Sequence, residues 1–160
     1  RRLSRRAYGT RLSSNVRPHM SDLAALAYVS SAATDFSESD LEALLKAARD
    51  ENARGELTGV LLYHDRTFFQ YLEGPERELH LAYQRIKNSR KHHGIIQLFL
   101  RTIVKREFKG WRMGFSRAPR SLILQLSNAE WTEIASASAE NPERPVGMAL
   151  LLEFWRSSTR

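Results

Sequence analysis

The segment TGVLLY (58–63), followed by HDR (64–66) and TFFQYLE (67–73), decides the fold of this chain. The two outer runs are rich in aliphatic, aromatic and β-branched residues, a composition typical of strands. The three residues between them have the length of a hairpin loop. Gly74 and Pro75 then interrupt the pattern, and Pro75 suits the start of a helix. We therefore predict an antiparallel hairpin that leads into a helix.

Elements on both sides of this hairpin complete the pattern. Residues 24–29 form an apolar run that predicts a buried strand, and residues 30–37 are predicted to form a loop. Ser39 and Glu42 then form a capping-box pattern that opens a helix. After the hairpin come a helix with an apolar face and predicted strands at 95–104 and 111–115. The order βαββαββ predicts an α+β fold, a ferredoxin-like sheet with two helices on one face.

The basic charge of the chain is concentrated at its beginning. Residues 1–19 contain six arginines and no acidic residue, whereas 20–160 hold 19 basic and 18 acidic residues, so the net charge of +7 belongs almost entirely to the first segment. This segment is poor in apolar residues, and we expect it to be disordered and non-native, with Met20 as the native start. A basic arm that binds nucleic acid is the alternative, and the nearly neutral remainder argues against it.

The part of the chain that follows divides into two predicted regions. We expect residues 20–117 to form the main domain and 118–160 to form a helical extension that packs on the open face of the sheet. Within the extension, Ser127 and Glu130 form a second capping pattern, and 146–156 reads as a helix. Exposed apolar residues of the extension would alternatively form a dimer or partner surface.

Composition excludes several kinds of function. The chain has no cysteine, which excludes a disulfide scaffold and a cysteine nucleophile and fits a reducing compartment, so we expect a cytoplasmic protein. No apolar run approaches the roughly 20 residues that a membrane span needs. The histidines show no metal-ligand spacing, and we expect no metal site.

Three polar side chains occupy positions where the pattern calls for apolar ones. Gln70 shares its strand face with Phe68 and Leu72, and a buried amide costs roughly 1–3 kcal/mol for each group without a hydrogen-bond partner. Asn52 continues the apolar stripe of the first helix, and Tyr28 lies in the first strand. Singly, each fits a structural hydrogen-bond network, with Asn52 capping its helix.

Trp111 and Met113 alternate on the last predicted strand, where on pattern alone they fill the core. Taken with Tyr28, Asn52 and Gln70, they group a phenol, two amides, an indole and a thioether without a charged group. Such a set suits binding a flat heterocycle with a polar edge better than it suits acid–base catalysis.

Several of these segments resemble the BLUF family, the sensors of blue light using FAD. The resemblance covers roughly 22–116 and is carried by Tyr28, ENARGELTGVLLY (51–63), FFQYLEG (68–74), RKH (90–92) and GWRM (110–113). It implies a blue-light photoreceptor that binds a flavin, with FAD expected and FMN or riboflavin as fitting alternatives.

The resemblance also implies roles for individual residues. Tyr28 would donate an electron and a proton, and Gln70 would lie between Tyr28 and the flavin and rearrange its hydrogen bonds. Met113 and Trp111 would be the mobile residues of the last strand, one of which approaches Gln70. The expected flavin contacts are Asn52 at the C4 carbonyl and N3 edge, Leu44 and Ile86 on either side of the ring, and Arg85 and Lys91 at the ribityl or phosphate groups.

The resemblance implies a switch rather than an enzyme, whose signal passes through the last strand and the C-terminal helices to a separate effector protein. A homo-oligomer is a further expectation. The alternative from the residues is an acylphosphatase-like enzyme on a ferredoxin-like fold. Against it, the first strand is followed by SSA (30–32) and not by a glycine-rich phosphate cradle.

Overall fold

The computed structural model describes residues 22–131 and 144–158. Nine elements follow one another in these ranges: β1 (Leu23–Ala32), α1 (Glu38–Arg54), β2 (Thr58–His64), β3 (Thr67–Pro75), α2 (Glu76–Asn88), β4 (His92–Ile103), β5 (Gly114–Arg117), α3 (Arg120–Asn128) and α4 (Val146–Ser158). The predicted leader at 1–19 lies outside the described residues, as do residues 132–143 of the predicted extension.

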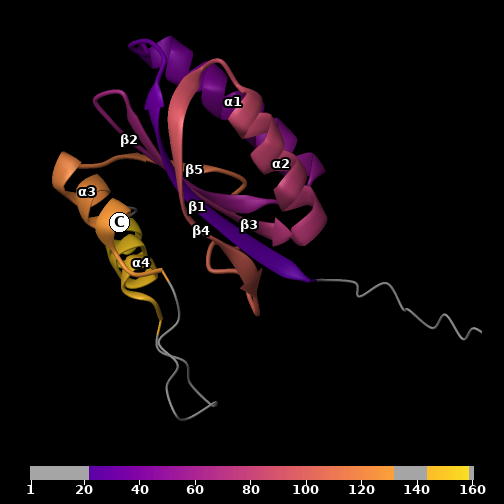
Figure 1. The fold of residues 1–160 in the computed structure, drawn as a ribbon. Coiled ribbons are helices and arrows are strands. Elements are labelled where there is room, and N and C mark those ends of the chain that lie inside the picture. The colour runs from indigo at the N-terminus through magenta and orange to yellow at the C-terminus, as the bar shows by residue number, and fades with distance from the viewer. Residues whose placement is uncertain (1–21, 132–143, 159–160) are drawn as a thin grey trace, which may run out of the picture.

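The strands form one five-stranded sheet in the order β4-β1-β3-β2-β5. The first four strands are antiparallel neighbours, and β5 adds in parallel to β2. Helices α1 and α2 cover one face of the sheet, and α3 and α4 lie on the other (Figure 1). The predicted α+β class and ferredoxin-like order with two helices on one face are therefore confirmed.

The hairpin that decides the fold forms as predicted. Asp65 and Arg66 turn the chain with positive φ angles of 40° and 64°. In the β3 strand the side chains alternate between two cores: Phe68 and Leu72 pack under α1 and α2, whereas Phe69 and Tyr71 pack under α3 and α4. This alternation is the two-residue period of a strand that is buried on both faces.

Several predicted boundaries were wrong. Strand β1 continues through Ala32 because its later residues still pair with β3 and β4. The N-cap of α1 is Ser37, whose hydroxyl accepts a hydrogen bond from the backbone N–H of Asp40, so the capping box begins two residues before the predicted Ser39. Ser127 does not start a helix: it lies in the last turn of α3, where its hydroxyl donates to the carbonyl of Ile123.

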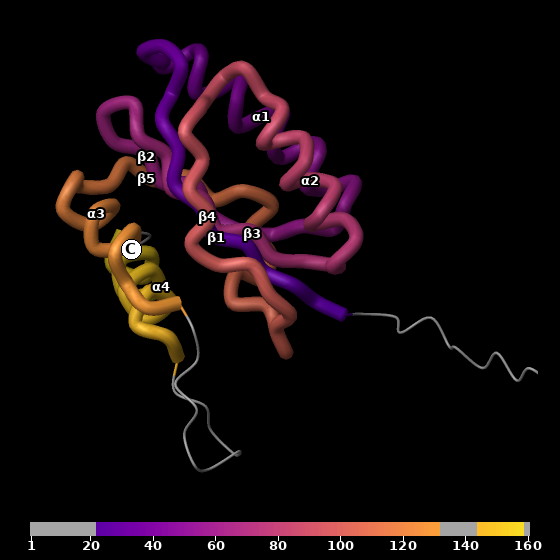
Figure 2. Tube along the Cα trace, viewed as in Figure 1, coloured from indigo at the N-terminus to yellow at the C-terminus, as the bar shows by residue number. Residues whose placement is uncertain are grey.

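The last strand also begins later than predicted, at Gly114 instead of Trp111. Residues 111–113 approach the sheet without joining its ladder, after Gly110 has turned the chain with a φ of 82°. The tube in Figure 2 shows this segment between β4 and β5 as part of a long excursion that returns to the edge of the sheet.

Helices α3 and α4 close the face of the sheet opposite α1 and α2. Their buried side chains join those of the strands in one cluster that includes Phe69, Leu126, Trp131, Leu151 and Trp155. In the two described ranges, no helix combines the length and the apolar character that crossing a membrane requires.

Candidate functional site

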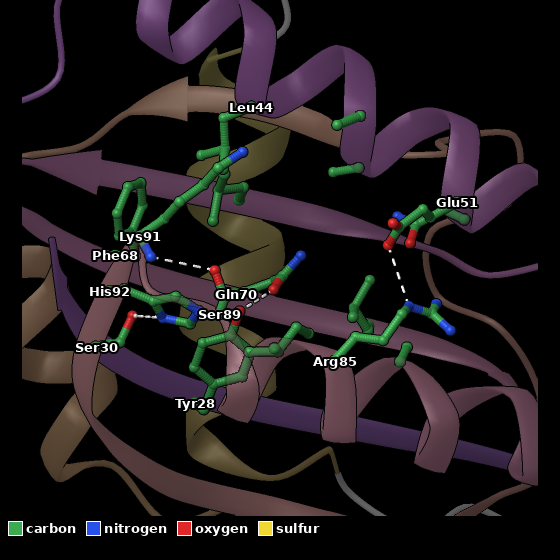
Figure 3. Close-up of a pocket in the computed structure, with 17 residues that line it drawn as sticks. Tyr28, Ser30, Leu44, Glu51, Phe68, Gln70, Arg85, Ser89, Lys91 and His92 are labelled. Carbon is green, nitrogen blue, oxygen red and sulfur yellow. Dashed lines mark hydrogen bonds and ion pairs between the residues drawn. The ribbon is translucent and has the colours of Figure 1, made fainter. Parts of the chain in front are cut away.

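A pocket opens between α1 and α2, above the central strands of the sheet (Figure 3). Its volume of about 220 Å³ compares with the roughly 10–15 Å³ that one water molecule occupies on such a measure. Its walls are alanines and aliphatic side chains of the two helices, and its floor comes from β1, β2 and β3: Leu44, Ala47, Ala48, Ala82 and Ile86 form the walls, and Tyr28, Leu61, Phe68, Gln70 and Leu72 the floor. Small side chains on both helices leave a slot for a flat group.

Gln70 and Tyr28 meet at the base of this pocket. The two residues are directly opposite each other in the register of β3 and β1, and the Tyr28 hydroxyl donates a hydrogen bond to Oε1 of Gln70. Their side chains are 6% and 4% exposed. A one-residue shift of register would turn one of them to the opposite face, so strand pairing fixes this contact.

Burial raises the pKa of the Tyr28 hydroxyl far above its ordinary value, and the nearby Tyr83 adds to the rise. The phenol is therefore neutral at every physiological pH and keeps its proton in the hydrogen bond to Gln70.

The nitrogen of the Gln70 amide faces Met113. Nε2 donates to the Met113 sulfur at 3.5 Å, and that side chain is 2% exposed. A thioether is a weak acceptor, and the amide nitrogen carries two N–H groups. Gln70 therefore retains donor capacity for a better acceptor inside the pocket.

Asn52, at the end of α1, is buried beside the same segment. Its Nδ2 donates to the carbonyl of Arg112 at 2.5 Å, and the Nε of Arg49 donates to the carbonyl of Met113 at 3.0 Å. Helix α1 thus holds the backbone of 112–113. Asn52 also lines the pocket, and its carboxamide has an oxygen and a second N–H with which to meet a ligand there.

Trp111 lies away from the pocket. It is 43% exposed, and its ring packs edge-on against Trp155 of α4 with 5.2 Å between ring centroids. The prediction that Trp111 and Met113 share one strand face was therefore wrong, because the backbone at 111–113 is not a strand. Met113 is the one of the two that approaches Gln70.

Charged and polar residues surround the mouth of the pocket. Arg85 of α2 donates to Glu51 of α1 at 3.1 Å, which links the two helices across the opening (Figure 3). Both side chains are about half exposed. Lys91, also exposed, lies at the other end of the mouth next to Ser89. The predicted contact residues Leu44, Ile86, Arg85 and Lys91 thus all line one pocket with Asn52 and Gln70.

His92 and Ser30 line the pocket and were not predicted as site residues. His92 Nδ1 lies 3.0 Å from the Ser30 hydroxyl, and its ring lies 6.2 Å from that of Tyr28. Burial lowers the pKa of His92, although the carbonyl of Ile86 opposes that shift. The sequence signal was present: Ser30 shares a strand face with Tyr28 once β1 extends to Ala32.

A flat aromatic ligand with hydrogen-bonding groups along one edge suits this pocket. Apolar walls would contact the two ring faces, and the amides of Gln70 and Asn52 would meet the polar edge. Arg85 and Lys91 at the mouth would meet a polar or anionic tail. A flavin has all three parts, and the donor set of the pocket fits it.

Comparison with known proteins identifies the class of this sensor-like domain. Residues 23–114 match the model of the BLUF family, described as sensors of blue light using FAD. This match covers more than half of the chain, and the chain belongs to the BLUF family. The family is one of blue-light sensors that use a flavin, and this match favours that reading over the acylphosphatase-like alternative.

Two individual relatives show which kinds of protein the chain resembles. The chain is 33% identical over 76 residues to the blue light- and temperature-regulated antirepressor BluF of Escherichia coli, and 33% identical over 88 residues to the photoactivated adenylate cyclase subunit beta of Euglena longa. These matches cover 48% and 55% of this chain but only 19% and 10% of the relatives. The chain therefore matches about a tenth to a fifth of the length of these relatives.

Solved structures agree with the family. The dark-state structure of BlrB, a BLUF protein, aligns with a TM-score of 0.66 at 26% identity, over 87% of this chain and 98% of that one. A bacterial light-regulated adenylyl cyclase aligns with a TM-score of 0.58 at 25% identity, over 86% of this chain and 35% of that one.

Proposed function

We propose that Tyr28 and Gln70 are the photoactive pair of this sensor and that the slot between α1 and α2 holds the flavin ring. The observation that carries the proposal is the buried hydrogen bond from the Tyr28 hydroxyl to Gln70 Oε1 on the pocket floor. Leu44 and Ile86 hold the ring between the helices, and Asn52 binds its carbonyl and imide edge.

A bound flavin would supply blue-light absorption and an excited-state oxidant within reach of a nearby phenol. Tyr28 is the electron donor, and its hydroxyl proton moves to the Oε1 atom that already accepts the hydrogen bond. The amide of Gln70 then turns or tautomerises, and the electron and the proton return to Tyr28. The lasting change is the new orientation of one amide, so the domain acts as a switch and nothing is consumed.

The signal leaves the pocket through Met113. When the Gln70 amide turns, the Met113 sulfur loses its N–H donor, and the next residue, Gly114, lies directly beneath Trp155 of α4. A Cβ atom on Gly114 would lie 2.5 Å from Cζ2 of that indole. A shift of the backbone at 113–114 therefore moves Trp155 and α4, the bistable output element that such a switch requires.

Helix α4 then acts on a separate effector protein, with a second copy of the chain as a further partner. Relatives named as an antirepressor and as cyclases illustrate effectors of two kinds. The name of the family favours FAD as the flavin, whereas one solved relative, BlrP1, is described with FMN. Flavin released from denatured protein and separated by chromatography should be FAD; FMN alone would overturn that assignment.

The photoactive pair is tested with tyrosine variants. The wild-type protein should show a reversible red shift of its flavin absorption band under blue light, because the turned amide donates to the ring carbonyl. Tyr28→Phe should bind flavin and lose the shift. Tyr63→Phe is the matched control, since Tyr63 is equally buried on β2 but does not line the pocket. A normal shift in Tyr28→Phe would overturn the proposal.

A further inference from the structure

Glu73 is a fully buried carboxylate that the proposed photochemistry does not use. It lies three residues after Gln70 on β3, so its side chain points to the opposite face of the sheet, and it is 0% exposed. Leaving a charged group there without partners would cost several kcal/mol or more. The hydrogen-bond partners of Glu73 therefore indicate the role of this residue.

Four donors converge on the carboxylate. Oε1 accepts from the backbone N–H of Phe108 at 2.6 Å and from the Thr58 hydroxyl at 3.2 Å. Oε2 accepts from the backbone N–H of Glu107 at 2.8 Å and from the Tyr71 hydroxyl at 3.2 Å. An ionised carboxylate is an acceptor only, and this set suits it. Burial raises the pKa of Glu73, and the four donated hydrogen bonds oppose that rise.

The guanidinium of Arg106 strengthens the same network without binding the carboxylate itself. It donates to the Thr58 hydroxyl at 2.9 Å, to the carbonyl of Glu73 at 3.4 Å and to the carbonyl of Glu56 at 2.7 Å. Residues 106–108 are therefore fixed to the start of β2 and to the end of β3.

This fixed point lies just upstream of the residues that meet Gln70. From Phe108 the chain turns at Gly110, and the backbone N–H of Trp111 donates to the carbonyl of Phe108 at 3.2 Å. The carbonyl of Trp111 accepts from the N–H of Gly59 at 2.9 Å. The segment 109–113 is thus held at its start by Glu73 and at its end by α1, through Asn52 and Arg49.

We propose that Glu73 is a positioning residue for the photoresponse: it anchors residues 107–108 from the far face of the sheet and thereby places Met113 against Gln70. The inference rests on the proposed function of Gln70 and Met113. The anchor keeps light-driven movement of the backbone from spreading upstream of residue 109, so its strength sets how fast the signalling state returns to the dark state.

The test measures dark recovery of the flavin absorption in a double-mutant cycle. Glu73→Gln places an NH₂ group against hydrogen-bond donors and weakens the anchor. Dark recovery should therefore become about threefold faster or more, a factor at the lower end of the interaction energies between residues of one hydrogen-bond network. In a Met113→Ala background the same substitution should change the rate by less than about twofold. A merely structural role would give equal changes in both backgrounds, and that result would overturn the proposal.

Two further variants keep the test decisive. If Glu73→Gln fails to bind flavin, Tyr71→Phe replaces it in the cycle, because this variant removes one of the four donors. Dark recovery should then accelerate less, and the same comparison between the wild-type and Met113→Ala backgrounds decides the outcome. Ile123→Val, at a buried position of α3, is the stability control and should recover at the wild-type rate. Absence of any red shift in the wild type would instead show failure of the proposed photoactive pair.

Discussion

The two faces of the sheet are built for different purposes, although the same strands form both. Under α3 and α4, the face is filled by large apolar and aromatic side chains, including the near-stacked rings of Phe69 and Trp131 at 5.8 Å. Under α1 and α2, the corresponding face keeps a pocket with an amide and a phenol at its base. Successive side chains of strand β3 point alternately to the two faces.

This difference shows how the fold separates stability from sensing. The closed face supplies close packing, and the open face leaves space and unused hydrogen-bonding capacity. Ala82 and Leu126, one on each face, should therefore affect flavin binding and stability respectively, and Trp155 tests the connection between the faces.

The largest effect is expected from filling the pocket. Ala82→Leu adds three carbons to a buried wall residue of α2, in the space assigned to the flavin ring. Flavin affinity should fall by about 100-fold or more, equivalent to ~2.7 kcal/mol, as measured by titration of the apoprotein. Ala43→Leu on the exposed side of α1 is the control and should bind like the wild type. Equal loss in both variants would place the flavin elsewhere.

A cavity in the closed face should give the next largest effect, and on stability alone. Leu126→Ala removes a side chain that is 0% exposed and should lower the free energy of unfolding by about 2–5 kcal/mol. Chemical denaturation measures the loss, and the light-induced shift should keep its size. A shift lost in the folded variant would show that the two faces are not separable.

The connection between the faces should be visible at Trp155. Trp155→Leu removes the ring that covers Gly114 and meets Trp111. We expect a moderate loss of stability, about 1–3 kcal/mol, and an unchanged flavin shift. Hydrogen exchange of α4, however, should no longer differ between dark and light. A light-dependent difference that persists in the variant would exclude this route.

The smallest effect should come from pH. Because burial lowers the pKa of His92, the unfolded chain binds more protons than the folded one just below the ordinary pKa of histidine, and stability falls as pH decreases through that window. Unfolding free energies measured between pH 7.5 and about 5.5 should decline less in His92→Gln than in the wild type. Identical pH profiles would show that His92 does not contribute.

The sequence predicted the elements that follow a simple period and missed those that do not. Alternation in 67–73 predicted the hairpin and the burial of Gln70, and strand pairing then placed that amide against Tyr28. The same alternation held a second signal that was overlooked. Glu73 continues the face of Phe69 and Tyr71, and a charged residue in that position indicates a buried network as plainly as Gln70 does.

The backbone path of residues 111–113 could not be predicted from local periodicity, because long-range contacts determine it. Trp111 and Met113 alternate in sequence like strand residues, but hydrogen bonds from Gly59, Asn52 and Arg49 hold their backbone outside the ladder. Which of the two side chains approaches Gln70 depends on these contacts and on Trp155, and no local pattern contains them.

The central claim is that the Gln70 amide relays the change between Tyr28 and the flavin, and one measurement tests it most directly. A light-minus-dark absorption spectrum of Gln70→Leu, purified with its flavin and compared with the wild type, isolates this amide, since leucine keeps the volume and removes every hydrogen bond. We predict bound flavin and no light-induced red shift. A shift of wild-type size in this variant would contradict the account.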